Sequence, residues 1–221
     1  MNGATRLFVF VCLILAAAAP ALAGPMYFNF SGTFVQDDNR SDFVFNILSP
    51  AVVTLQSWSY AGGTDPLSNI VPGGGFGPVL SLFDSAGNLL AFDNGGTVGG
   101  IAPKDCASGG RLQDAVSGLC LDAFEQVALG AAGSYRLVIT EQDNIPAGLT
   151  LADGFALNGT GNFTGGPFID AGGNQLTSNF YFTVGLVDDA RPAPVPEPAP
   201  VLLLASVLAL FFCRGPMQMR G

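Results

Sequence analysis

Residues 78–92, PVLSLFDSAGNLLAF, contain two apolar segments separated by a polar turn. The first segment, Pro78 to Phe83, is a compact apolar run, and Leu89 to Phe92 returns after the turn. Residues 84–88, DSAGN, are of the types that favour a hairpin turn. This stretch therefore predicts a pair of antiparallel strands on which the rest of the chain can build.

The flanking chain repeats this pattern of short apolar segments between turns. Phe28, Phe30 and Phe34 alternate with Asn29, Ser31 and Thr33, and a period of two indicates a half-buried strand. By the same criterion we expect strands at 24–34, 42–47, 51–57, 133–140 and 179–187, and either a strand or a short helix at 122–129. Seven to nine strands with 18 phenylalanines to fill a core predict a mainly β fold, an antiparallel β-sandwich.

The segments between these strands are rich in glycine. We expect a long loop at 62–77, a glycine-rich loop at 93–121, and an irregular region at 144–173 with a short strand near Leu149 and Leu151. Residues 188–194 predict a linker stiffened by Pro192 and Pro194. The sandwich domain is therefore expected to span residues 24–187.

The N-terminus has the composition of a secretory signal peptide. Arg6 precedes an apolar run from Leu7 to Ala19, and Ala21-Leu22-Ala23 then offers small residues for cleavage between Ala23 and Gly24. We therefore expect a signal helix in residues 1–23 and export of the remaining chain across the inner membrane.

The C-terminus has three parts, a proline motif, an apolar run and a basic end. Val195-Pro196-Glu197-Pro198 should be extended, because proline fixes φ and restricts the residue before it. Val201 to Cys213 carries no charge, and Arg214 follows. The run suits either a core helix or a short membrane helix. The membrane alternative is favoured because the run has no polar face.

This order of motif, apolar run and arginine resembles the PEP-CTERM sorting signal of exported bacterial proteins. The resemblance rests on Val195, Pro196, Glu197, Pro198, the run to Cys213 and Arg214, and covers residues 195–221. It implies recognition by an exosortase, a membrane cysteine protease, and transient anchoring in the inner membrane of a Gram-negative bacterium. It also implies a location at the cell surface or in the matrix, in association with exopolysaccharide and biofilm.

A second, weaker resemblance concerns the exported region. Residues 42–45, 78–90 and 132–138 follow one another as in the bacterial pre-peptidase C-terminal domain, a small β-sandwich of secreted proteases and surface proteins. This resemblance implies a jelly-roll or pre-peptidase-C-like β-sandwich.

Composition restricts the function further. Residues 24–195 hold 5 basic and 16 acidic residues, a formal net charge of −11, so nucleic-acid binding is disfavoured. Cys106 and Cys120 predict a disulfide in an oxidising compartment, because a metal site would need further ligands. No histidine is present, which removes Ser-His-Asp and Cys-His catalysis and the common zinc sites.

The remaining polar groups give no catalytic, cofactor or metal motif. Carboxylate pairs as in glycosidases arise by chance among 16 acids, and the acidic turns near Asp37, Asp93 and Asp143 suit either calcium or ordinary turns. Trp58 and Tyr60 suit either a sugar-stacking platform or the core. The sequence therefore predicts a structural or adhesive surface protein that is not an enzyme, the alternative being a non-catalytic carbohydrate-binding module.

Overall fold

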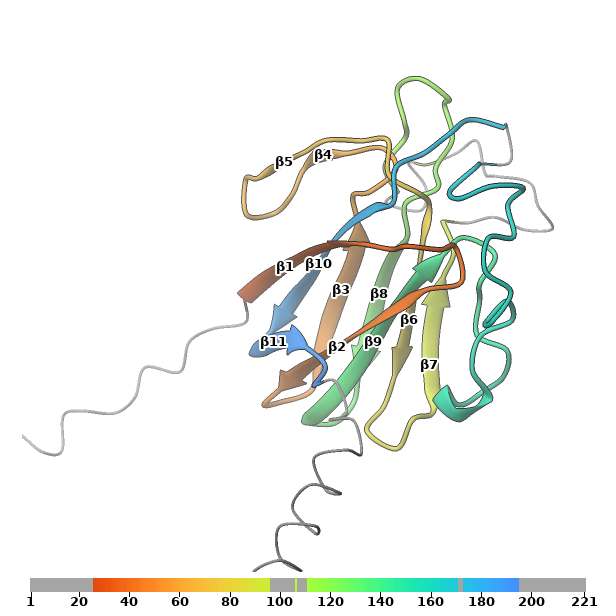
Figure 1. The fold of residues 1–221 in the computed structure, drawn as a ribbon. Coiled ribbons are helices and arrows are strands. Elements are labelled where there is room, and N and C mark those ends of the chain that lie inside the picture. The colour runs from red at the N-terminus through yellow and green to blue at the C-terminus, as the bar shows by residue number, and fades with distance from the viewer. Residues whose placement is uncertain (1–25, 96–105, 107–110, 171–172, 195–221) are drawn as a thin grey trace, which may run out of the picture.

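The structure is a computed structural model that describes residues 26–95, 106, 111–170 and 173–194 (Figure 1). The expected signal helix and cleavage site at Ala23 and Gly24 lie outside these residues, as does the C-terminal segment from Val195 with its expected hydrophobic helix. No helix within the described ranges is long and apolar enough to cross a membrane.

The described chain is mainly β, and all its sheets are antiparallel. A four-stranded sheet has the order β1 (Met26–Thr33), β10 (Asn179–Val187), β3 (Ala51–Ser57), β8 (Phe124–Leu129). A five-stranded sheet has the order β11 (Asp189–Pro192), β2 (Arg40–Ile47), β9 (Gly133–Glu141), β6 (Pro78–Phe83), β7 (Leu89–Asp93). A small hairpin joins β4 (Gly63–Thr64) to β5 (Ile70–Val71).

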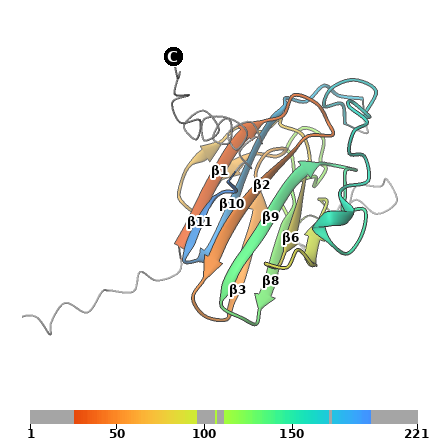
Figure 2. The same cartoon turned by 60° about the horizontal axis from the view of Figure 1, so that its bottom comes forward.

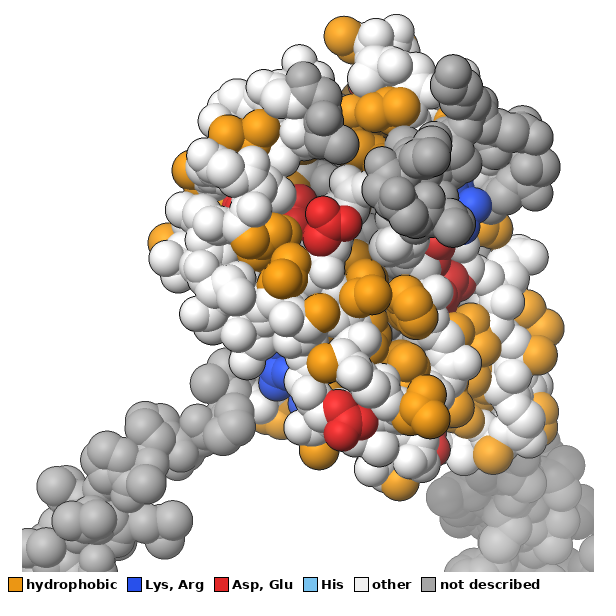
Figure 3. Space-filling model, turned by 90° about the vertical axis from the view of Figure 1, so that its right-hand side faces the viewer, with side chains coloured by type: hydrophobic (Ala, Val, Ile, Leu, Met, Phe, Trp, Pro, Cys, Tyr) orange, Lys and Arg blue, Asp and Glu red, His pale blue; other side chains and the backbone are white. Residues whose placement is uncertain are grey.

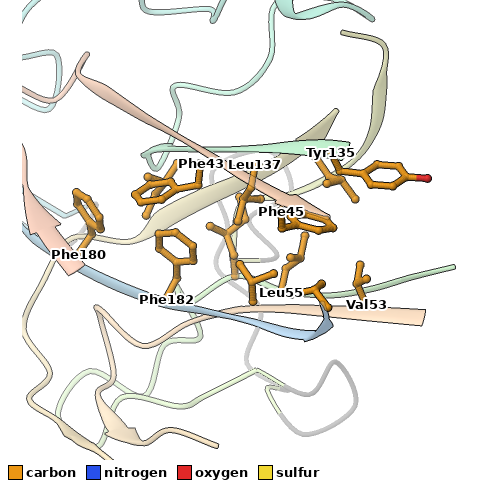
Figure 4. Close-up of a cluster of buried hydrophobic side chains, with 14 of the residues drawn as sticks. Phe43, Phe45, Val53, Leu55, Tyr135, Leu137, Phe180 and Phe182 are labelled. Carbon is orange, nitrogen blue, oxygen red and sulfur yellow. The ribbon is translucent and has the colours of Figure 1, made fainter. Parts of the chain in front are cut away.

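The two larger sheets lie face to face and enclose the core (Figures 1 and 2). Their edge strands approach each other on both sides, β1 with β11 and β8 with β7. Figure 4 shows Phe43 and Leu137 of one sheet pointing toward Phe182 and Leu55 of the other. The ring centroids of Phe43 and Phe182 are 4.7 Å apart, within the range of favourable edge-to-face contacts. Burial of such side chains is the main force that holds the two layers together.

The alternating patterns place these side chains in the core. Phe43, Phe45 and Ile47 are buried on β2, and Val53 and Leu55 are buried on β3. The predicted strands at 24–34, 42–47, 51–57, 133–140 and 179–187 and the hairpin at 78–92 are all confirmed. The ambiguous segment 122–129 forms a strand, β8, which is paired with β3.

The loop predictions need three corrections. The segment 62–77 is not a continuous loop, because β4 and β5 pair within it. Leu149 and Leu151 do not form a strand: Leu151–Asp153 is a single 3₁₀ turn, and Thr150 makes an isolated bridge with Asn88. Residues 189–192, predicted as linker, form β11 and pair with β2.

Strand β11 tolerates a proline because it is an edge strand. Pro192 is its last residue and faces Phe43 of β2, so the missing N–H interrupts no interior ladder. The chain passes from β10 in one sheet to β11 in the other through Asp188 alone. Asp188 secures this crossing, since its Oδ2 accepts a hydrogen bond from the Leu48 N–H at 2.6 Å.

Cys106 and Cys120 form a disulfide, as predicted, with their Cα atoms 5.5 Å apart. Both cysteines are buried. The bond links Cys106 to Cys120, which lies four residues before β8.

Candidate functional site

A groove of about 470 Å³ lies between the β4–β5 hairpin and the outer face of the four-stranded sheet. Its lining comes from β1, β10 and the segment 71–75. In Figure 1 the hairpin stands beside β1 and β10 at the end of the sheet. We call this cavity the hairpin groove.

The pairing of β1 with β10 forms one wall of the hairpin groove. Ser31 faces Tyr181 and Thr33 faces Asn179 across the two strands. Because Phe30 and Phe182 point into the core, these four intervening side chains point outward. The polar half of the alternation in β1, visible in the sequence, therefore supplies part of the site.

Several polar side chains at this wall have no fixed partner. Ser31, Thr33, Thr177 and Asn179 are exposed. No hydrogen bond between described residues involves the side chains of these four residues. Their hydroxyl and amide groups can therefore donate to and accept from a ligand without breaking an internal bond.

Asp65 attaches the hairpin to the sheet. Its Oδ2 accepts hydrogen bonds from Tyr181 Oη at 2.6 Å, Asn69 Nδ2 at 2.9 Å and Asn29 Nδ2 at 3.4 Å. Its Oδ1 accepts the backbone N–H groups of Leu67 and Asn69. These bonds join the hairpin loop to side chains of β1 and β10.

This arrangement keeps Asp65 ionised. Burial by itself would raise the pKa of Asp65, but the hydrogen bonds from Tyr181, Asn69 and Asn29 outweigh it and lower the pKa to about 2. Burial, together with the bond to Asp65, raises the pKa of Tyr181 to about 12. Tyr181 therefore stays a neutral phenol whose ring is fixed at the side of the groove.

The floor of the groove is held by a second buried carboxylate. Asp122 is fully buried, and its Oδ1 accepts hydrogen bonds from Ser57 Oγ at 2.7 Å and from the Ser59 N–H at 2.8 Å. Ser59 in turn receives the Tyr181 N–H at 2.9 Å and donates its hydroxyl to the Tyr181 carbonyl. The groove is thus built on a network that orders both β10 and the segment after β3.

The pair Trp58 and Tyr60 does not form an open stacking platform. Trp58 is only 7% exposed, donates its indole N–H to Thr183 Oγ1 at 3.2 Å, and lies beneath Gly63 of the hairpin. Tyr60 is 4% exposed and donates its hydroxyl to Ser117 Oγ at 2.9 Å, in the segment closed by the disulfide. Of the two interpretations that the sequence left open, the structure supports the buried one.

The acidic turns mostly serve the fold. Asp37 is fully buried and accepts the Phe168 N–H at 2.7 Å, while Asp93 pairs with Arg111 at 2.8 Å and accepts the Phe124 N–H. Within the described ranges, no three His, Cys, Asp or Glu side chains are grouped so that they could hold a metal ion. Most of these carboxylates replace missing backbone partners in loops.

The hairpin groove offers hydrogen bonding rather than proton transfer. Hydroxyl and amide groups do not ionise near neutral pH, and Pro72 and the Tyr181 ring give apolar contact area. The predicted sorting residues Val195, Pro196, Glu197, Pro198 and Arg214 lie outside the described residues, so their position relative to the groove is not part of the structure. Comparison of the chain with family models and with curated proteins gave no match.

Proposed function

We propose that this chain is an exported bacterial surface or matrix protein that associates non-catalytically with extracellular polysaccharide. The hairpin groove carries this proposal, because it combines uncommitted hydroxyl and amide groups with apolar walls. Ligand sites are commonly apolar with a few polar groups that set orientation. A sugar ring has a complementary surface, with apolar C–H faces and hydroxyl groups at its edges.

The ends of the chain support the export part of the proposal. Residues 1–23 have the composition of a signal peptide, and residues 195–221 resemble a PEP-CTERM signal. The C-terminal helix holds the precursor transiently in the inner membrane, and an exosortase recognises Val195 to Pro198. The protein then acts at the cell surface or in the extracellular matrix, in a structural or adhesive role.

The domain itself suits an oxidising and crowded exterior. Two facing antiparallel sheets support the β-sandwich class that the weaker resemblance implies. The jelly-roll or pre-peptidase-C-like connection of the strands is part of the proposal. A buried disulfide adds stability without a cofactor. Figure 3 shows acidic and apolar side chains among mainly uncharged ones on one face, and the net charge keeps such a surface soluble.

The experiment that tests the function combines location with binding. The full chain, tagged after Gly24, is expressed in a bacterium that has an exosortase and an exopolysaccharide, and cells and matrix are separated. We expect the tagged chain in the matrix fraction, and we expect it to leave that fraction when polysaccharide synthesis is deleted. Retention in the matrix of the deletion strain would contradict polysaccharide association, and retention in the cytoplasm would contradict export.

A further inference from the structure

We infer that the hairpin groove selects an uncharged polysaccharide strand, in preference to acidic or amino-sugar polymers. This inference rests on the proposed function and names the class of ligand. Its structural basis is the lining: Ser31, Thr33, Thr177, Asn179 and Tyr181 provide polar contacts, and none of the described lining residues carries a charge. In a domain of net charge −11, such a neutral lining sets the groove apart from its surroundings.

Acidic polysaccharides are disfavoured by repulsion. The groove lacks any arginine or lysine among its lining residues, so a bound carboxylate or sulfate would lose water without gaining an ionic partner. The negative charge of the domain adds long-range repulsion at low ionic strength. The free energy of binding in this groove should therefore be less favourable for a polyanion than for a neutral strand.

Amino-sugar polymers are disfavoured for a different reason. A bound ammonium group needs a carboxylate with free acceptor positions, and the carboxylate nearest the Tyr181 hydroxyl is Asp65. Asp65 is 4% exposed and already accepts five hydrogen bonds, so it cannot turn toward the groove without releasing the hairpin. Asp65 thus holds the hairpin against the sheet and has no acceptor position left for a bound ammonium group.

The neutral groups that remain match a neutral sugar. The Tyr181 ring, fixed by its bond to Asp65, and the exposed Pro72 offer contact for the C–H faces of a sugar. Across the strand pair, Thr33 and Asn179 can bond the hydroxyl groups at the edge of the same ring. Because both walls are built on paired strands, the ligand meets a groove that is already formed.

The test measures binding of the full chain, purified in detergent, to three soluble polymers. These are a neutral β-glucan, the polyanion alginate, and chitosan oligomers. At 500 mM NaCl, where non-specific attraction of chitosan to the acidic domain is screened, we expect the β-glucan to bind more tightly than either charged polymer. We also expect its Kd to change by less than about twofold between 50 and 500 mM NaCl, because screening affects only charged partners. Tighter binding of alginate or chitosan would overturn the inference.

Substitutions in the hairpin groove test whether the β-glucan binds there. Thr33→Val and Thr177→Val keep side-chain volume and remove one hydroxyl, and each should weaken β-glucan binding about threefold to tenfold. Tyr181→Ala should weaken it by about tenfold or more, while Thr54→Val, on the same sheet outside the groove, should bind normally. Wild-type affinity in all the groove variants would overturn the inference and leave polysaccharide association standing. Failure to bind any of a wider set of polysaccharides would overturn the proposed function itself.

Discussion

The two glutamates in the described chain, Glu125 and Glu141, differ in hydrogen bonding and pKa from three aspartates that lie in turns. Asp65, Asp84 and Asp114 accept backbone and side-chain hydrogen bonds in turns, and these bonds lower the pKa of each. Burial instead raises the pKa of Glu125 to about 8 and that of Glu141 to about 9. The Oε2 atoms of both glutamates are buried and accept no hydrogen bond from the described residues. Asp65, Asp84 and Asp114 therefore organise loops, whereas Glu125 and Glu141 are enclosed as neutral acids at neutral pH.

Glu141 should make the domain less stable as the pH rises. Between about pH 4.5 and pH 9 the unfolded side chain is ionised while the folded one keeps its proton, so the folded state loses stability as the pH increases. Glu141→Gln cannot ionise and should therefore be more stable than wild type at pH 8, with a smaller difference at pH 5. Urea midpoints at the two pH values measure this, with Asp189→Asn as a half-exposed control. Equal pH dependence of wild type and Glu141→Gln would contradict the prediction.

At the level of elements, the sequence predicted the strands that have one buried and one exposed face. The alternation in 42–47 and 51–57 was sufficient because each strand presents a regular apolar face to the core. The two-residue strands β4 and β5 are too short to show any period, and their positions depend on the Asp65 network. The hairpin groove could be foreseen only in part: the polar face of β1 was visible, but the wall opposite it was not.

Strand β11 was not predicted, because Asp189-Ala190-Arg191-Pro192 has the composition of a linker. Its role is tertiary, since Ala190 faces Phe45 of β2 and packs against the core. We predict that Ala190→Asp destabilises the domain by about 1–3 kcal/mol, because it places a carboxylate beside apolar side chains. The same substitution at the exposed Ala132 should change stability by less than about 0.5 kcal/mol. Urea unfolding measures both, and a neutral Ala190→Asp would show that residues 189–192 act as a linker.

At the scale of the whole molecule, the disulfide contributes to the stability of the domain. Cys106 and Cys120 are 14 residues apart, and closing such a loop stabilises the folded state by about 3 kcal/mol through restriction of the unfolded chain. The double variant Cys106→Ala/Cys120→Ala should therefore melt at a lower temperature than wild type. Reductant should lower the melting temperature of wild type toward that of the variant and leave the variant unchanged. An unaltered melting temperature in both cases would show that the bond contributes little.

The proposed sorting role of residues 195–221 can be tested at a single residue, Glu197. Glu197 is the only charged residue between Arg191 and Arg214, and it stands between two prolines that favour an extended backbone. An exosortase that reads an extended peptide next to the membrane should therefore recognise this carboxylate. Glu197→Gln keeps the size of the side chain and removes its charge. Pro196→Ala removes one restraint on the backbone.

Both variants should fold and be exported but remain as the heavier, membrane-bound precursor. Gel mobility and membrane fractionation in a host that has an exosortase measure this, and Pro194→Ala, just before the motif, is the matched control that should be processed normally. If Glu197→Gln and Pro196→Ala were processed at the wild-type rate, residues 195–221 would act as a plain anchor. The hairpin groove would then belong to a protein that stays in the membrane and is not sorted to the matrix.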